Sequence, residues 1–186
     1  MVYNKSLFTD GYDLNGLNGP AITGLNITPN TIKLGIDNKI YALNSSNNAI
    51  SVIDRSTYSI SRTILTKFGP SDFAVDDINE KLYIANTTTD VIQIVDLNTF
   101  TEQLVSHTNP YSIAINPNLN RLYIADRQNT IQVMDTNTRQ IIRTITVGSH
   151  GSIFISNLLY DNNILYALHI PVSTDIPKLY FIEGLI

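Results

Sequence analysis

The chain has 186 residues and three histidines. Two of these, His150 and His169, are the residues best suited to metal or acid–base chemistry. Two imidazoles together with a carboxylate such as Asp126 or Asp175 form a ligand set that zinc and other transition metals accept. These residues are far apart in the sequence, so they make a site only if the fold brings them to one place. The elements that carry them therefore decide between a metal site and an unrelated structural role.

Other motifs for catalysis are weak. His107 follows Ser106, but no aspartate can be assigned to complete a nucleophilic triad. Asp76 and Asp77 are adjacent, and neighbouring strand residues point to opposite faces, so we expect a solvated turn rather than a proton-sharing pair. The sequence has no G-x-S-x-G, phosphate-binding glycine loop or H-E-x-x-H motif. It also has no cysteine, which excludes disulfides and thiolate sites.

The secondary-structure elements are indicated by a sequence motif that occurs four times. The motif has apolar residues on both sides of a tyrosine, then a polar loop, then an apolar strand that ends in an acid. The tyrosines lie 42, 40 and 43 residues apart. The motif begins at Ile40-Tyr41-Ala42, Leu82-Tyr83-Ile84, Leu122-Tyr123-Ile124 and Leu165-Tyr166-Ala167. A period near 40 with strand-like content predicts an all-β fold, a β-propeller with about four blades of four antiparallel strands.

Each of the first three repeats contains the spacing Asp-x-x-Thr. The acids are Asp54, Asp96 and Asp135, and Glu183 stands at that place in the fourth repeat. An aspartate can accept a hydrogen bond from the backbone N–H two residues later, and the threonine hydroxyl can close the same turn. We therefore expect these acids to shape the turn between the third and fourth strands rather than to take part in catalysis.

The second repeat predicts the strand positions most clearly. We expect an inner strand over 72–76, a second over 81–86, a third over 91–96 and a fourth over about 101–106. The second strand is apolar on both faces, as expected for a sheet that lies between two other sheets.

These residues resemble the YVTN-type β-propeller repeats, a family related in shape to the WD-repeat and NHL propellers. The resemblance covers roughly residues 28–186 and is strongest in the second and third repeats. The third runs from Asn109-Pro110-Tyr111 to the closing Thr144-Ile145-Thr146-Val147-Gly148. It implies a propeller and a tendency to act as a binding or surface scaffold. It does not imply one activity, because propellers have many unrelated functions.

We expect a single propeller domain over 1–186, with blades at about 28–70, 71–110, 111–150 and 151–186 and an irregular segment at 1–27. The last blade has no fourth strand of its own, and Val2–Thr9 could supply it, so that the ring closes by pairing of N- and C-terminal strands. One alternative is that four blades are half of an eight-bladed ring made by two chains, so that the protein is a dimer rather than a monomer. Another is that the chain is a fragment of a longer propeller.

The net charge of −4 and the scattered basic residues argue against nucleic acid as a partner. No apolar run is long enough to predict membrane insertion. The first ten residues lack the apolar core of a signal peptide, which predicts a cytoplasmic protein, or an extracellular or surface-associated one if a leader is missing. No cofactor is expected.

Loops carry recognition on rigid scaffolds, so we expect binding at the end of the sheets that departs most from the repeat. The residues expected there are Phe68, Asn109, Tyr111, Asp126, Arg127, His150 and His169. The predicted function is a non-enzymatic binding or structural scaffold that presents these loops to a protein or glycan partner. The alternative is a propeller enzyme of lactonase or lyase type, with His150, His169 and Asp126 holding a metal at the channel mouth. Against the metal site, terminal repeats often depart from the pattern because they close or cap the fold.

Overall fold

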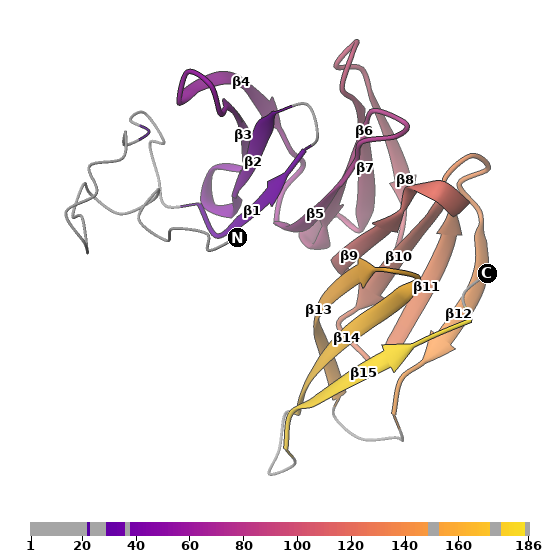
Figure 1. Cartoon of the computed structure of the whole chain (residues 1–186). Coiled ribbons are helices and arrows are strands. Elements are labelled where there is room, and N and C mark those ends of the chain that lie inside the picture. The colour runs from indigo at the N-terminus through magenta and orange to yellow at the C-terminus, as the bar shows by residue number, and fades with distance from the viewer. Residues whose placement is uncertain (1–21, 23–28, 36–37, 149–152, 172–175, 185–186) are drawn as a thin grey trace. The chain divides into compact units, whose positions relative to one another are not determined.

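The computed structural model describes residues 22, 29–35, 38–148, 153–171 and 176–184 (Figure 1). The described residues are all-β and form four antiparallel sheets of three or four strands, which confirms the predicted propeller-type fold with four blades. The chain divides into two compact units, Met1–Leu65 and Thr66–Ile186, which we describe separately. The closing strand predicted at Val2–Thr9 and the whole of 1–21 lie outside the described residues.

In the first unit, the described residues form one sheet whose strands follow their order in the chain. Its strands are β1 (Thr31–Leu34), β2 (Lys39–Asn44), β3 (Ala49–Asp54) and β4 (Ser59–Leu65), with a 3-10 turn at Ser45–Asn47. On one face of this sheet, Ile22 packs with the buried Ile40, Ala42 and Ile53.

The second unit contains three sheets, again with strands in chain order. The first of them has β5 (Pro70–Asp76), β6 (Lys81–Asn86), β7 (Val91–Asp96) and β8 (Glu102–Ser106). The next has β9 (Pro110–Asn116), β10 (Arg121–Asp126), β11 (Thr130–Asp135) and β12 (Ile141–Thr146). The last has β13 (Ile153–Asp161), β14 (Ile164–Pro171) and β15 (Lys178–Ile182).

Two apolar layers hold these three sheets together, and the repeat tyrosines are central to both. Tyr83 lies between the first and second sheets of the unit, and Tyr123 lies between the second and third. Both are almost fully buried, and burial raises the pKa of Tyr83 to about 12. Leu82, Ile84 and Ala85 are also buried, so this second strand is buried on both of its faces.

The Asp-x-x-Thr segments form the predicted turns. The Asp96 carboxylate accepts hydrogen bonds from the backbone N–H groups of Asn98 and Thr99, at 3.0 and 2.8 Å. Asp54 and Asp135 do the same in their own turns. Lys81 forms an ion pair with Asp96, and this lowers the pKa of that carboxyl. The pairing was not predicted, because Lys81 belongs to a different strand.

The prediction for Asp76 was wrong. Asp76 does not lie in a solvated turn: it is fully buried, and its carboxylate accepts hydrogen bonds from the backbone and side-chain nitrogens of Asn79 at 2.9 and 3.0 Å. The second strand of the last blade, which carries His169, runs to Pro171 and is two residues longer than the second strands of the other three blades. It is longer because its partner β13 is also longer, nine residues with a register shift between Ile155 and Asn157.

Candidate functional site

Each sheet of the second unit has two ends of different character, because its strands are antiparallel and consecutive. One end carries the links that enter β5 and β9 and the loops from β6 to β7 and from β10 to β11. We call this end the link face (residues 66–69, 87–90, 107–109 and 127–129). The other end carries the turns after the inner strands and the Asp-x-x-Thr turns, and we call it the turn face.

On the link face, the structure brings together two of the predicted binding residues, Tyr111 and Arg127. The Arg127 guanidinium carbon lies 5.1 Å from the centre of the Tyr111 ring, a cation–π contact. Arg127 is exposed, whereas Tyr111 is half-buried. A guanidinium and a phenol therefore lie side by side at the surface.

The backbone beneath this pair is fixed by hydrogen bonds from the preceding blade. Thr87 Oγ1 donates to the Pro110 carbonyl oxygen at 2.6 Å, and Ser71 Oγ donates to the Tyr111 carbonyl oxygen at 2.6 Å. Two hydroxyls of one sheet thus position the tyrosine of the next. Sequence reasoning missed them because serine and threonine are common in loops.

Phe68 lies in the link before β5, and its side chain is 70% exposed. The link itself is anchored on both sides of this residue. The Lys67 N–H donates to Gln93 Oε1 at 3.1 Å, and the Gly69 carbonyl oxygen accepts from the Thr87 N–H at 2.9 Å. A large apolar side chain is therefore exposed on a fixed backbone.

Asn109 and Asp126 take part in hydrogen bonds that order the loops of the link face. The Asn109 N–H donates to the Asp90 carboxylate at 2.7 Å, which joins two loops of the link face. The Asp126 carboxylate accepts from the Gln128 and Thr130 N–H groups at 3.0 and 3.2 Å and from Thr130 Oγ1 at 2.5 Å. Four hydrogen bonds to these two carboxylates thus order the loops around Arg127.

The predicted metal ligands do not form a site in the part of the chain that the structure describes. His150 and Asp175 lie outside that part. His169 is only 2% exposed, and its ring lies edge-on to Tyr180 with centres 6.2 Å apart. Among the described residues, no three His, Cys, Asp or Glu side chains lie close enough together to hold a metal ion.

His107 is a buried histidine beneath the link face. Its Nδ1 donates to the Thr108 carbonyl oxygen at 3.2 Å. Burial lowers the pKa of this imidazole below its ordinary value of 6.5, despite the opposing effect of Asp126 and Asp90. The sequence placed His107 in a loop and gave no signal that it is buried.

We expect His107 to make stability pH-dependent. Because its pKa is lower in the folded than in the unfolded chain, protons bind preferentially to the unfolded chain. The stabilisation is complete above about pH 6.5 and is lost as the pH falls below that value. The melting temperature should fall between pH 7 and pH 5, and it should fall less in His107→Asn. Equal slopes for the two proteins would show that His107 does not cause the dependence.

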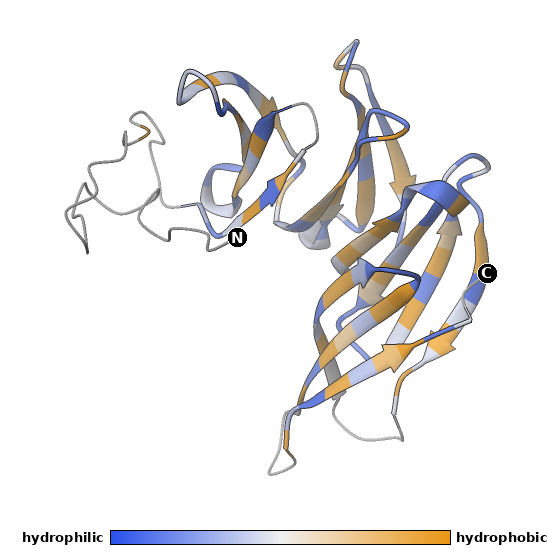
Figure 2. Ribbon diagram, in the orientation of Figure 1, coloured by the Kyte–Doolittle hydropathy of each residue, from blue (hydrophilic) through white to orange (hydrophobic). Residues whose placement is uncertain are grey.

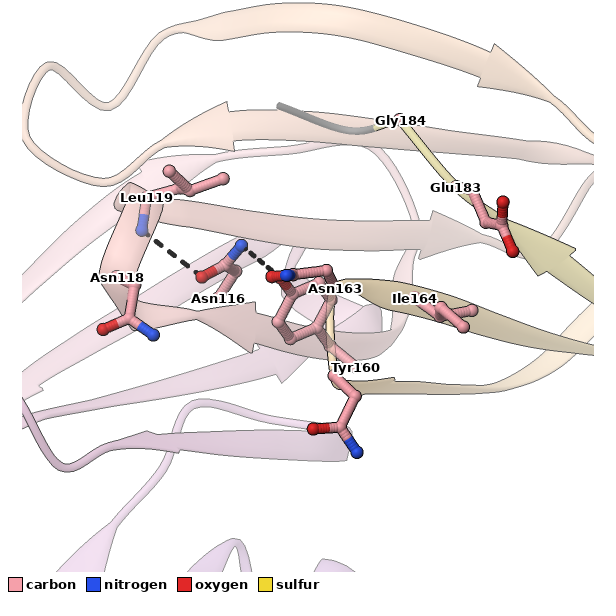
Figure 3. Close-up of a pocket in the computed structure, with 9 residues that line it drawn as sticks. Asn116, Asn118, Leu119, Tyr160, Asn163, Ile164, Glu183 and Gly184 are labelled. Atoms are coloured by element: carbon pink, nitrogen blue, oxygen red, sulfur yellow. Dashed lines mark hydrogen bonds between the residues drawn. The ribbon is translucent and has the colours of Figure 1, made fainter.

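The turn face carries a hollow of about 410 Å³, whose lining includes four asparagine side chains, one tyrosine and one glutamate (Figure 3). Its polar walls come from the turn after β9, the turn between β13 and β14, and the residues after β15. The lining residues are Asn116, Asn118, Leu119, Tyr160, Asn162, Asn163, Ile164, Glu183 and Gly184.

A chain of hydrogen bonds fixes the centre of the hollow. Asn116 Nδ2 donates to Tyr160 Oη at 2.6 Å, and Tyr160 Oη donates to Asn163 Oδ1 at 3.0 Å (Figure 3). The Tyr160 ring stacks on the ring of Tyr123, with centres 5.5 Å apart. The hollow therefore offers fixed amides beside an aromatic ring. Sequence reasoning did not find it, because its residues come from two blades.

No protein-family model matches the sequence, and no curated protein matches it. Solved structures do resemble the chain. Hydrazine synthase of Kuenenia stuttgartiensis superposes with a TM-score of 0.74 over 88% of this chain and 49% of that chain, at 21% identity. U3-55K superposes with a TM-score of 0.68 over 86% of this chain and 54% of that chain, at 9% identity. The chain thus spans about half the length of these structures, and the likeness shows a propeller-type fold alone. The described residues include no helix that is long and apolar enough to cross a membrane.

Proposed function

We propose that the chain is a non-catalytic binding module that recognises a protein partner through its link face. The observation that carries this proposal is the Tyr111–Arg127 pair, held on a backbone that the preceding blade fixes. Tyrosine and arginine are enriched among the residues that dominate protein–protein affinity. The exposed Phe68 of the neighbouring link adds an apolar contact on the same face.

The inner strands support a binding role over catalysis. Enzymes on propellers need polar groups that converge on a substrate. Here Asp72, Asp76 and Asn116, the acidic and amide residues of the inner strands β5 and β9, are buried and make hydrogen bonds within the protein. The lactonase or lyase alternative also needs Asp126, whose carboxylate already caps its own loop.

We also propose that the chain belongs to the YVTN-type propellers. The four tyrosine motifs and the three Asp-x-x-Thr turns support this assignment, since both occur at equivalent places in successive sheets. The matched structures support only the fold.

A glycan partner is the second candidate, and the amide-lined hollow of the turn face favours it. Amides donate and accept hydrogen bonds without charge, which suits sugar hydroxyls, and the neighbouring Tyr160 ring offers an apolar surface. Titration with neutral oligosaccharides, followed by the chemical shifts of the asparagine amides, tests this candidate. Unchanged shifts at Asn116, Asn118 and Asn163 would eliminate the hollow as a glycan site.

The link-face proposal is tested with a double variant, Tyr111→Ala with Arg127→Ala. We expect it to bind the partner recovered from the native source at least tenfold more weakly, because two of the dominant contacts are lost. The matched control is Ile78→Ala with Arg139→Ala, which removes an apolar residue and an arginine from the turn face and should bind normally. Loss of binding only in this control would place the interface on the turn face.

A further inference from the structure

The acids that end the third strands have basic partners in the first three blades but not in the last. In each of these three blades the second strand begins with a lysine or arginine, and the strand register places it opposite the acid. The three pairs are Lys39 with Asp54, Lys81 with Asp96 and Arg121 with Asp135. Lys81 and Arg121 form ion pairs with their acids, the latter at 2.5 Å. A basic residue of the same sheet therefore stands beside each of these acids.

The register identifies the equivalent pair in the last blade. Leu165 begins the tyrosine motif of this blade and pairs with Ile182. One position further, the same register places Ile164 opposite Glu183, where the other blades have the basic residue and the acid. The strand β14 thus begins with an apolar residue, and apolar residues run along it (Figure 2). Among the described residues, none forms an ion pair or a hydrogen bond with the Glu183 carboxylate. The last blade therefore has the acid without the cation.

Ile164 and Glu183 both line the hollow of the turn face. Figure 3 shows them on one side of the hollow, with Asn118 and Leu119 on the other side. Among the lining residues that the structure describes, Glu183 carries the one charged side chain. A carboxylate without a counter-charge in a recess attracts a positive charge. The place that lysine or arginine takes in the other blades is therefore open to a cationic group of a ligand.

The rest of the lining suits the hydroxyl groups and the ring of a sugar. Asn163 accepts a hydrogen bond from Tyr160 Oη through its amide oxygen, and its amide nitrogen makes none with a described residue. The Asn118 side chain also makes none with a described residue, so both amides can bond to ligand hydroxyls. Leu119 and Ile164 add apolar surface for the C–H groups of a sugar ring. The volume of the hollow lies within the range of roughly 300–1,000 Å³ of small-ligand pockets.

We propose that the hollow binds an amino sugar, with its ammonium group beside Glu183 and its hydroxyl groups on the asparagine amides. This inference rests on the second candidate function, a glycan partner, and specifies the class of sugar. The ammonium group takes the place that the side chains of Lys81 and Arg121 take beside the acids of the preceding sheets. It donates hydrogen bonds to the carboxylate, which a neutral sugar cannot match with a charge.

Titration of the full chain with three ligands tests the inference, at about pH 6.5, where a primary amine is protonated. The ligands are a glucosamine oligosaccharide, its fully N-acetylated form and a simple alkylamine, and the asparagine side-chain chemical shifts report binding. We expect the glucosamine form to bind about fivefold more tightly than the acetylated form, and less so with added salt. Equal affinity for the two sugars would overturn the inference and leave a neutral glycan as the candidate, whereas unchanged shifts with both sugars would eliminate both. An alkylamine that binds as tightly as the amino sugar would overturn the inference, because the hollow would then recognise the cation alone.

Two substitutions test the role of the missing cation. Glu183→Gln keeps the shape of the side chain and removes its charge, so it should bind the amino sugar about fivefold more weakly and the acetylated sugar equally well. Ile164→Lys supplies the cation from the protein, as in the preceding sheets, and should also abolish the preference for the amino sugar. Glu80→Gln is the matched control, because it removes an exposed acid from another turn of the turn face, and it should bind as the natural chain does. A preference for the amino sugar that survives both Glu183→Gln and Ile164→Lys would overturn the inference.

Discussion

Replacing Asp72 by alanine is expected to lower the free energy of unfolding by about 3 kcal/mol or more. The Asp72 carboxylate is buried and accepts hydrogen bonds from Ser112 Oγ at 2.8 Å and from the Ile113 N–H at 2.9 Å. It also accepts one from the N–H of the adjacent residue, Phe73, at 2.8 Å. Ser112 Oγ in turn accepts from the Leu158 N–H at 2.9 Å. Alanine leaves these donors buried without their acceptor, at a cost of roughly 1–3 kcal/mol for each.

Urea unfolding at neutral pH measures this effect. Asp72→Asn is the matched control, because the amide oxygen keeps one acceptor and the loss should be smaller. Ser112→Ala should be strongly coupled to Asp72→Ala in a double-mutant cycle, since the two side chains share one network. Additive effects, or an alanine variant as stable as the natural chain, would show that the network does not join the three inner strands.

The second large effect is expected from Gly69→Ala, at about 3 kcal/mol. Gly69 has a φ of +70°, where an L-residue pays roughly 1–2 kcal/mol. An added Cβ would also overlap the Thr88 side chain, and overpacking costs roughly a further 1–3 kcal/mol. The link that carries Phe68 would have to move.

Gly184→Ala provides the control for this prediction. Gly184 has nearly the same φ, +68°, but its added Cβ would meet nothing within 4 Å. The Gly184→Ala variant should lose only the stability that the strained backbone costs. The difference in stability between the two variants therefore isolates the overlap with Thr88. Equal losses in thermal unfolding would mean that the Gly69 link adapts without strain.

The repeat predicted the parts of the fold that depend on local pattern. Tyr83 and Tyr123 were expected in the core and are there, because alternation along a strand determines which face a side chain takes. The Asp96 turn was predicted for a similar reason, since its hydrogen bonds span only two and three residues.

Contacts that do not follow from the alternation along a strand could not be predicted in this way. The aspartate at 76 is buried and capped by Asn79, although its adjacent acid and turn position suggested a solvated residue. The Tyr111–Arg127 contact joins a residue of β9 to one in the loop after β10, and the hydroxyls of Ser71 and Thr87 donate to backbone oxygens that lie 40 and 23 residues further along the chain. The alternation of apolar and polar residues along a strand does not show which residues far apart in the sequence come into contact.

The central claim is that the link face of the second unit meets the partner, and site-specific photo-cross-linking tests it most directly. A photoreactive amino acid is placed at Phe68 on the link face and, in a separate protein, at Ile78 on the turn face, since both side chains are well exposed. In the native source, we predict a partner adduct from position 68 that disappears in the Tyr111→Ala, Arg127→Ala background, and none from position 78. An adduct from position 78 alone, or one from position 68 that survives the double substitution, would contradict the account.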